Sequence, residues 1–304
     1  MKTITFFNEK GGVGKSTLAI MYASWLHYKF GKAVTVVDLN NRIESYRRDE
    51  LEEKKSLGTA GNYDMEAIWP ILAPRREDME KFKGQKIPYS MWLDDQIKGG
   101  AMKGADVAII DLPGSGSGKE YSSMLLGRHI GLYIIPTDRD AMTMRATLAV
   151  SNTLKVYGKG EVYAVFINQV QSYVAMKEYE KVAELLKKRV PVLPDLISYS
   201  ERLKTLSKVD IIKSTLEYPD FNAKAFEGSR DLGLENLFID VTRLLEKTPD
   251  HRNTGAADLG FVHGLKKEFK DRRTLMHSSF PEFDFPEEMF PKSRRSKKED
   301  SEME

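Results

Sequence analysis

The sequence predicts an α/β protein built on a doubly wound, mostly parallel sheet. Three observations support this fold class. Short apolar runs recur without the polar alternation of a half-exposed strand, as expected for parallel strands covered on both faces. Stretches with apolar residues at helical spacing separate these runs. A glycine-rich turn between Asn8 and Thr17 joins the first apolar run to the first helical stretch, which gives the chain a strand–turn–helix beginning.

The first part of the chain is expected to alternate strands with helices. Gly31 follows the first helical stretch and ends it, because glycine readily adopts the left-handed conformation of a helix end. Asp38 closes the second strand. The expected elements are a strand at Ile4–Phe7, a helix from Leu18 to Phe30, a strand at Ala33–Val37, a charged, solvated helix at 43–56, and short helices over the carboxyl edge of the sheet between 58 and 104.

The alternation continues to about residue 247. The expected elements are strands at Ala105–Asp111, Ile130–Pro136 and Val162–Ile167, helices at Arg139–Tyr157, Met176–Arg189 and Glu201–Lys208, a short edge strand at Val190–Pro194, and an amphipathic helix from Leu234 to Leu245 that ends near Lys247. Composition changes after that point. We therefore expect one domain over residues 1–247 and a largely disordered C-terminal extension over 248–304, with a possible short helix.

Composition limits the kinds of protein this can be. The 304 residues are 41% hydrophobic, enough for a core, and include no cysteine. The lack of cysteine excludes disulfides, thiolate metal sites and an iron–sulfur cluster ligated by this chain. The net charge of +2 requires neither nucleic acid nor membrane as a partner. No apolar run reaches the roughly 18 residues of a membrane span, and the first residues predict a strand, so a soluble, cytoplasmic protein is expected.

The glycine-rich turn has the chemistry of a phosphate-binding loop. Glycine lets the backbone approach a polyphosphate, and the N–H groups at the start of the following helix favour an anion. Glu9 occupies the position of the first glycine in the strict G-x-x-x-x-G-K-[ST] pattern, and the form K-G-G-x-G-K-[ST] matches instead. The residues expected to bind the nucleotide here are Gly11, Gly12, Val13, Gly14, Lys15, which reaches the β- and γ-phosphates, Ser16, which ligates Mg²⁺, and Thr17, near the α-phosphate.

Acidic and amide residues follow the other strands. Asp111 ends a strand of four apolar residues and precedes Pro113-Gly114. A phosphate-binding loop needs such a carboxylate to hold Mg²⁺ opposite the serine hydroxyl, so Ser16 and Asp111 are the expected metal residues. Asp38 and Asn40 follow the second strand. Each of these acids could instead simply close its strand.

The stretch Lys10–Thr17, with the second lysine, and the stretch Asp111–Gly114 resemble the ParA/MinD family of deviant Walker A P-loop ATPases. The resemblance implies a P-loop NTPase fold, ATP and Mg²⁺ as ligands, and a homodimer that forms on ATP binding. It also implies that Lys10 crosses the dimer interface to the partner's nucleotide, so the expected catalytic residues are Lys10, Lys15, Asp38 and Asn40. The family has an acid at the position of Asn40, and its replacement by an amide bears on hydrolysis rather than on binding.

The resemblance further implies that Asn168 contacts the adenine and that Pro194 packs against the base. The expected function is that of an ATP-dependent dimerising ATPase with slow hydrolysis, acting in plasmid or chromosome partition or in mobile-element transfer. Its expected partners are non-specific DNA and a DNA-binding or transfer-apparatus protein. Basic residues in 177–189 could bind DNA, but glutamates interleave with them, as in a solvated helix. The tail has no sustained apolar stripe, so a membrane is not an expected partner.

Two other functions remain open from the sequence. A nucleotide-gated adaptor with little or no hydrolysis would recruit a protein through the Phe- and Pro-rich segment Phe280–Pro291, a segment that could equally be a featureless tail. A small-molecule kinase or synthetase could use the same loop, although the second lysine argues against it.

Overall fold

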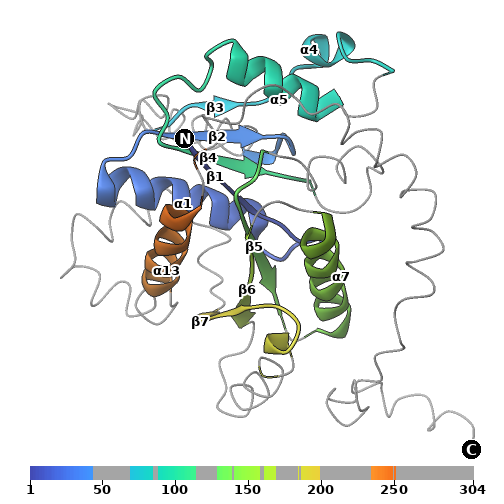
Figure 1. Ribbon diagram of the computed structural model, residues 1–304, viewed down its shortest axis with the longest axis vertical. Helices are drawn as coiled ribbons and strands as arrows, with labels where there is room; N and C mark the ends of the chain where they lie inside the picture. The colour runs from blue at the N-terminus through green and yellow to red at the C-terminus, as the bar shows by residue number, and fades with distance from the viewer. Residues whose placement is uncertain are drawn as a thin grey trace, which may run out of the picture. The chain divides into compact units, whose positions relative to one another are not determined.

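The computed structural model describes residues 1–43, 69–84, 88–113, 129–138, 140–157, 161–168, 184, 186–198, 234–248 and 250. All of them lie in one compact unit, Met1–Arg252. Figure 1 shows this unit as a sheet with helices on both faces. Apart from Thr248 and Asp250, the expected C-terminal extension lies outside the described residues.

The described strands form one seven-stranded sheet in which every neighbouring pair is parallel. The order across the sheet is β3-β2-β4-β1-β5-β6-β7. On one side of β1 the strands β5, β6 and β7 follow outward in chain order, and on the other side β4 lies between β1 and β2. This arrangement confirms the predicted doubly wound fold class. The strands are β1 Lys2–Phe6, β2 Val34–Asp38, β3 Ile71–Leu72, β4 Val107–Asp111, β5 Leu132–Thr137, β6 Glu161–Asn168 and β7 Val192–Ser198.

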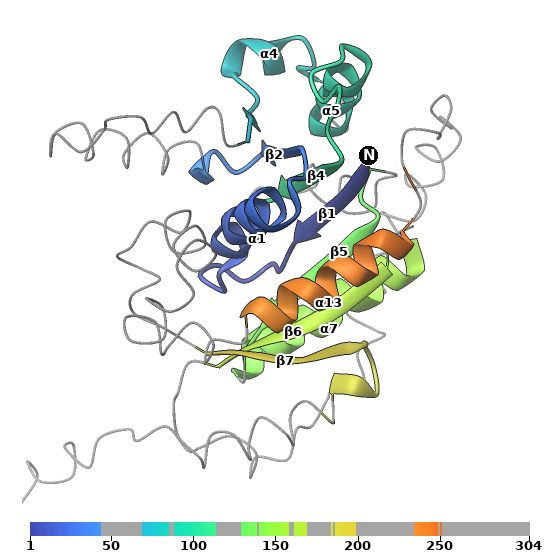
Figure 2. The ribbon, with the colours of Figure 1, turned by 90° about the vertical axis from the view of Figure 1, so that its left-hand side faces the viewer.

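Helices cover both faces of the sheet. Figures 1 and 2 show α1 and α13 side by side on one face and α7 on the other. The described helices are α1 Lys15–Phe30, α4 Arg76–Glu80, α5 Pro88–Lys98, α7 Ala141–Tyr157 and α13 Leu234–Lys247. α1 ends at Gly31, whose φ of 57° and N–H bond to His27 O form the predicted helix end.

Alternate side chains of the central strands point to opposite faces of the sheet, as the pleat requires. One set packs beneath α1 and α13, and there Tyr22 and Trp25 of α1 meet Phe238 of α13. The amphipathic helix predicted from Leu234 to about Lys247 is therefore confirmed. The strand residues of this layer are Ile4, Phe6, Val34, Val36, Val107, Ile109, Leu132 and Ile134.

Several predicted elements need correction. The region 58–104 contains a short strand, β3, that the sequence did not predict, because two residues carry no detectable periodicity. In the same region α5 faces the sheet rather than its carboxyl edge, because its Leu93 and Ile97 line a small cavity together with strand residues that include Val37 and Ile110. The predicted edge strand at Val190–Pro194 is β7, which continues to Ser198.

Other predictions concern residues outside the described ranges. Of the charged helix predicted at 43–56, only the first residue, Ile43, is described. The helix predicted at 176–189 is described only near its end, and the one at 201–208 lies outside.

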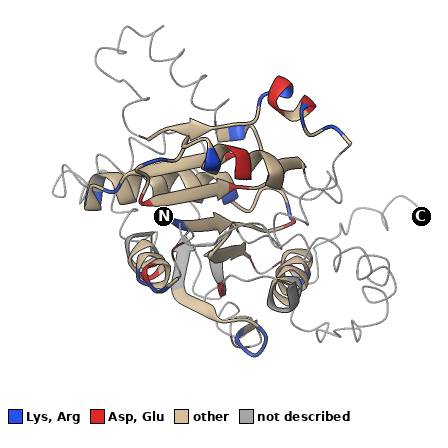
Figure 3. Cartoon of the chain, turned by 45° about the horizontal axis from the view of Figure 1, so that its top comes forward, with Lys and Arg blue, Asp and Glu red and all other residues tan. Residues whose placement is uncertain are grey.

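Because all strands are parallel, their carboxyl ends meet at one edge of the sheet. Asp38 and Asp111 are register partners at the ends of β2 and β4, and Asn168 pairs with Ser198 at the ends of β6 and β7. Figure 3 shows the strands largely free of charge, with basic and acidic residues on helices, loops and strand ends. Among the described helices, none has the length and apolar character needed to cross a membrane.

Candidate functional site

The loop Asn8–Thr17 begins where β1 leaves the sheet. The last main-chain rung is Phe7 N–H donating to Ile134 O at 2.9 Å. The chain then turns through Gly12 and Gly14, whose φ values of 78° and 85° suit glycine. Gly14 precedes α1 and offers no side chain to cap it, and the first turn holds no acid. The N–H groups at this helix start are thus available to an anion.

Lys15 is the first residue of α1, and its side chain turns back over the loop. It is only 7% exposed, and its Nζ donates to Lys10 O at 2.8 Å. Burial lowers the pKa of this ammonium, while the nearby Asp111 carboxylate opposes that shift. A buried cation held inside a glycine-rich turn is suited to bind a phosphate oxygen.

Asp111 is a fully buried acid that faces the loop. Its Oδ2 accepts from the Ser16 hydroxyl at 2.7 Å and lies 3.5 Å from Asn40 Nδ2. Burial raises the pKa of Asp111 to about 6; the neighbouring Asp38 adds to this rise and the bond from Ser16 opposes it. Its other oxygen, Oδ1, is buried and has no hydrogen-bond partner among the described residues.

This arrangement fits a hard cation. Mg²⁺ takes oxygen ligands, keeps several waters and usually binds one or two carboxylates together with phosphates. A buried carboxylate oxygen without a partner and the Ser16 hydroxyl beside it are such ligands. Within the described residues, no group of three or more His, Cys, Asp or Glu side chains could hold a metal ion alone, so a cation here would depend on water and a phosphate ligand as well.

Asp38 and Asn40 lie beside Asp111. The Asp38 carboxylate is fully buried and accepts from Asn40 N–H at 3.0 Å, which fixes the turn after β2. The next residue, Asn41, has a φ of 54°, a left-handed value that asparagine tolerates. Asn40 is thereby directed at Asp111 rather than away from the loop.

The second lysine, Lys10, does not point into its own loop. Its Nζ donates to Thr143 Oγ1 at 2.6 Å and to Asp140 Oδ2 at 2.8 Å, and Asp138 Oδ2 lies 4.0 Å away. These three residues come from the end of β5 and the start of α7. Sequence reasoning missed them, although the polar run after the predicted strand at Ile130–Pro136 is a signal that could have found them.

The structure separates the two residues expected near the base. Asn168 ends β6 at the carboxyl edge, the edge that also carries the loop. Pro194 is exposed and lies inside β7, four positions before Ser198, the partner of Asn168. The structure therefore does not bring Pro194 to that edge.

A polar cluster elsewhere in the fold has the residue types of a hydrolase site but not the geometry. His129 Nε2 lies 3.2 Å from Ser90 Oγ and 3.4 Å from Asp94 Oδ1. A catalytic triad uses opposite nitrogens of the histidine for these two contacts. Ser90 is also only 7% exposed, so the cluster joins α5 to the chain before β5.

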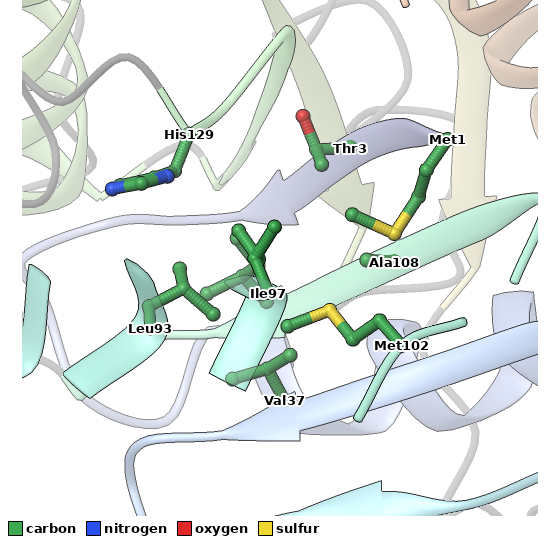
Figure 4. Close-up of a pocket in the computed structure, with 9 residues that line it drawn as sticks. Met1, Thr3, Val37, Leu93, Ile97, Met102, Ala108 and His129 are labelled. Atoms are coloured by element: carbon green, nitrogen blue, oxygen red, sulfur yellow. The ribbon is translucent and has the colours of Figure 1, made fainter. Parts of the chain in front are cut away.

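The cavity beside that cluster is too small for a ligand. Figure 4 shows it between α5 and the sheet, with Leu93, Ile97 and Met102 among its walls. It has about 10 Å³ of space, about the least that a water needs, and its walls are apolar. We therefore place the functional site at the loop Asn8–Thr17.

The comparisons with known proteins identify a family of nucleotide-binding domains. The family model described as the CobQ/CobB/MinD/ParA nucleotide binding domain matches residues 4–211, which include the loop, Asp38 and Asp111. Among curated protein sequences, no significant match is found.

Solved structures resemble the chain over most of its length. A MinD cell division protein of Aquifex aeolicus is 14% identical, covers 82% of this chain and 99% of its own, and has a TM-score of 0.52. A plasmid partition protein of Borrelia burgdorferi B31 bound to AMPPNP is 19% identical, with coverage of 81% and 98% and a TM-score of 0.53. The pNOB8 ParA bound to nonspecific DNA is 16% identical, with coverage of 81% and 98% and a TM-score of 0.50. At these identities the likeness shows the fold, which is the P-loop NTPase fold.

Proposed function

The chain belongs to the CobQ/CobB/MinD/ParA nucleotide-binding family, and from that membership we propose that it is a cytoplasmic, ParA-like ATPase that binds ATP with Mg²⁺ and dimerises on doing so. The observation that best supports the proposal is the pairing of two features at one helix start. Lys15 lies buried in a glycine-rich turn, and a buried Asp111 oxygen without a described partner lies close by.

The loop residues supply the binding. The N–H groups from Gly11 to Thr17 and the Lys15 ammonium are the donors for the phosphates. Ser16 and Asp111 would hold Mg²⁺ from the protein side. A bound Mg²⁺ would neutralise phosphate charge and hold the nucleotide in one orientation. Asn168 is our candidate for contacting the base, and Pro194 is given no role because it lies away from the carboxyl edge.

The repulsion between two bound triphosphates bears on how the proposed dimer could form. A triphosphate carries about four negative charges, and two of them can approach one another only if cations lie between them. Lys10 is the loop's second cation, and both Lys10 and its ion-pair partner Asp140 are partly exposed. An exposed ion pair of this kind contributes about 0.2–1 kcal/mol, so Lys10 loses little free energy when it leaves Asp140 for a phosphate.

Two alternatives are proposed for the rate of ATP hydrolysis. The Asn40 amide cannot accept a proton, but phosphoryl transfer mainly requires that the attacking water be held in place. Slow hydrolysis is therefore our first proposal. The second is a nucleotide-gated adaptor with little turnover that recruits a protein. It is favoured by one observation: Asn40 is directed at Asp111 and held there by Asp38.

We also propose a role in plasmid or chromosome partition or in mobile-element transfer, with non-specific DNA and a DNA-binding or transfer-apparatus protein as partners. Support comes from the fold shared with ParA and partition proteins, one of them bound to nonspecific DNA. DNA of random sequence should be retained in a gel shift with Mg²⁺–ATP and released without it. Equal retention with and without nucleotide would contradict this role.

Titration calorimetry with Mg²⁺–ATP tests the central proposal. Wild-type protein should release heat with a stoichiometry of one nucleotide per chain, and Lys15→Ala should weaken binding at least tenfold. Lys32→Ala is the matched control, because Lys32 is exposed beyond the far end of α1. Folded wild-type protein that gives no heat at high concentration would overturn the proposal.

A further inference from the structure

Asn8 is fully buried at the start of the loop and uses its amide in three directions. Its Nδ2 donates to Pro136 O of β5 at 2.8 Å and to Thr147 Oγ1 of α7 at 3.0 Å. Its Oδ1 accepts from Lys10 N–H at 3.0 Å. A buried amide satisfied by a strand, a helix and the loop fixes the position of each relative to the others.

The contact to Pro136 continues the sheet where the main chain leaves it. Ile134 O accepts from Phe7 N–H as the last main-chain rung between β1 and β5. Pro136 O is the next acceptor on that side of β5, and the Asn8 side chain donates to it in place of a main-chain N–H. The main chain can therefore turn into the loop without leaving a buried carbonyl unpaired.

A closed ring of hydrogen bonds runs from Asn8 through α7 to Lys10. Thr147 Oγ1, which accepts from Asn8, has one proton to donate, and its two acceptors are Thr143 O and Thr137 Oγ1, each 2.9 Å away. Thr143 Oγ1 in turn accepts from Lys10 Nζ. Asn8, Thr143 and Thr147 are buried completely or almost so, and thus the ring is shielded from water on the side away from the loop.

The main chain of Lys10 connects this ring to both lysines. Its N–H is bound by Asn8, and its carbonyl accepts from Lys15 Nζ at 2.8 Å. We propose that Asn8 and Thr147 are positioning residues that hold the Lys10 peptide in place, so that α7 sets the direction of both loop lysines. This inference rests on the proposed nucleotide binding and adds the residues that hold the two lysines in position.

Thr147→Val removes the hydroxyl with little change of shape and is the first test. ATP affinity should fall about tenfold, and the ratio of ATP to ADP affinity should fall as well, because the lysines act at the β- and γ-phosphates. Thr147→Ser keeps the hydroxyl and should restore both values. The matched control is Thr5→Val, which removes an equally buried hydroxyl that donates to Ile110 O, outside the ring.

Hydrogen exchange gives a second reading without nucleotide. In wild-type protein the Lys10 amide should exchange at least tenfold more slowly than the neighbouring Gly12 amide, and Thr147→Val should remove that protection. The Gly31 amide, which is bound to His27 O, should be unchanged. The wild-type measurement needs no variant, so a variant that fails to fold does not remove the test.

The outcomes separate this inference from the proposed function. Wild-type protein that binds no ATP overturns both. Wild-type protein that binds ATP, with a Thr147→Val variant of equal affinity or an unprotected Lys10 amide, overturns the positioning role alone. An equal loss in Thr5→Val would show a general loss of stability and would also overturn it.

Discussion

Burial disfavours the ionised form of Asp111, and the hydrogen bond from Ser16 and the charge of Lys15 offset this only in part. Its pKa is raised to about 6, against an unfolded value near 3.8. Between these pH values the folded chain holds a proton that the unfolded chain has lost, so stability falls as pH rises through this window and stays low above it. The carboxylate is therefore better suited to bind a metal than to stabilise the fold without one.

Asp111→Asn tests whether the ionised Asp111 carboxylate destabilises the fold when no metal is bound. At pH 8 without Mg²⁺ the variant should be more stable than wild type by about 1–3 kcal/mol, because it buries no charge. With Mg²⁺–ATP the order should reverse, since the variant loses the carboxylate that we propose as a Mg²⁺ ligand. Urea unfolding at pH 5 and pH 8, with and without Mg²⁺–ATP, measures both effects. A variant less stable than wild type at pH 8 without Mg²⁺ would contradict the raised pKa.

Asn40→Asp tests the effect of the amide that follows the second strand, at a position where the family has an acid. The new carboxylate lies beside Asp38 and Asp111 and can hold the attacking water, so steady-state phosphate release should rise by about tenfold. The same assay, repeated over a series of Mg²⁺ concentrations, gives the Mg²⁺ concentration at which the rate is half-maximal. Asn41→Asp adds the same charge one residue further on, at an exposed position, and should change neither value. Wild-type turnover at blank level that the aspartate restores would favour the adaptor.

Single residues were predictable where a spacing pattern carries the chemistry. Lys15, Ser16 and Asp111 come together as expected, because a strand–turn–helix and the end of a parallel neighbour allow little else. The partners of Lys10 were not predictable in this way. Asp140 and Thr143 lie about 130 residues along the chain, and only the pairing of β5 with β1 brings them to the loop.

At the scale of elements, α7 begins with a residue that serves two purposes. Asp140 Oδ2 accepts from Thr143 N–H at 3.1 Å, which is a helix N-cap, and also pairs with Lys10. The hydrogen bond from Lys10 lowers the pKa of this carboxyl. The start of α7 and the second lysine of the loop are thus joined through one side chain.

Variants at Asp140 can separate the two purposes. Asp140→Asn keeps a capping oxygen and should cost only a few tenths of a kcal/mol, because the ion pair it loses is half exposed. Asp140→Ala removes the cap as well and should cost about 1 kcal/mol. Urea unfolding of the two variants measures the difference. Equal losses would mean that the charge, not the cap, supports α7.

α13 closes the opposite face of the sheet, and Phe238 is its main contact. Its ring centroid lies 5.3 Å from that of Tyr22 and 5.8 Å from that of Trp25, and the side chain is fully buried. Phe238→Ala should therefore cost about 3–5 kcal/mol in the free energy of unfolding. The exposed Glu246→Ala on the same helix should change it by less than about 0.5 kcal/mol. A loss below about 1 kcal/mol for Phe238→Ala would show that α13 is loosely attached.

Elements with a strong local pattern were predictable, and those that depend on a neighbour were not. α13 has a clean apolar stripe and was predicted within two residues of its end. The edge strand that corresponds to β7 was predicted to end at Pro194, and a proline cannot donate a hydrogen bond to a neighbouring strand. In the structure the register between β6 and β7 shifts around that residue, from Ala164 with Val192 to Phe166 with Leu196, which lets the strand continue.

At the scale of the whole molecule, the alternation of strands and helices predicted a doubly wound sheet but not the order of its strands. That order places β1 between β4 and β5, so the loop receives Asp111 from one neighbour and Asp140 from the segment after the other. The same sheet brings the two ends of the described chain together, where Lys2 Nζ donates to Thr248 O beyond α13. Nothing in the local sequence of β1 indicates either neighbour.

The position of Lys10 leads to a prediction about assembly. In the single chain its ammonium pairs with Asp140, at the rim of the site and away from its own loop. Lys10→Ala should therefore still bind ATP, because Lys15 is untouched, but should stay monomeric when Mg²⁺–ATP is added. Wild type and Lys32→Ala should double in mass under the same conditions, as measured by light scattering on a sizing column.

The proposed slow hydrolysis would help this measurement, since the ATP state would then persist long enough to be observed without an analogue. The charge argument also fixes the direction of a salt effect. Two triphosphates facing one another repel less as ionic strength rises, so added salt should partly restore dimers in Lys10→Ala. If Lys10→Ala dimerises as fully as wild type at low salt, the lysine does not lie between the nucleotides. The bond to Asp140 would then be its working position rather than one that it leaves.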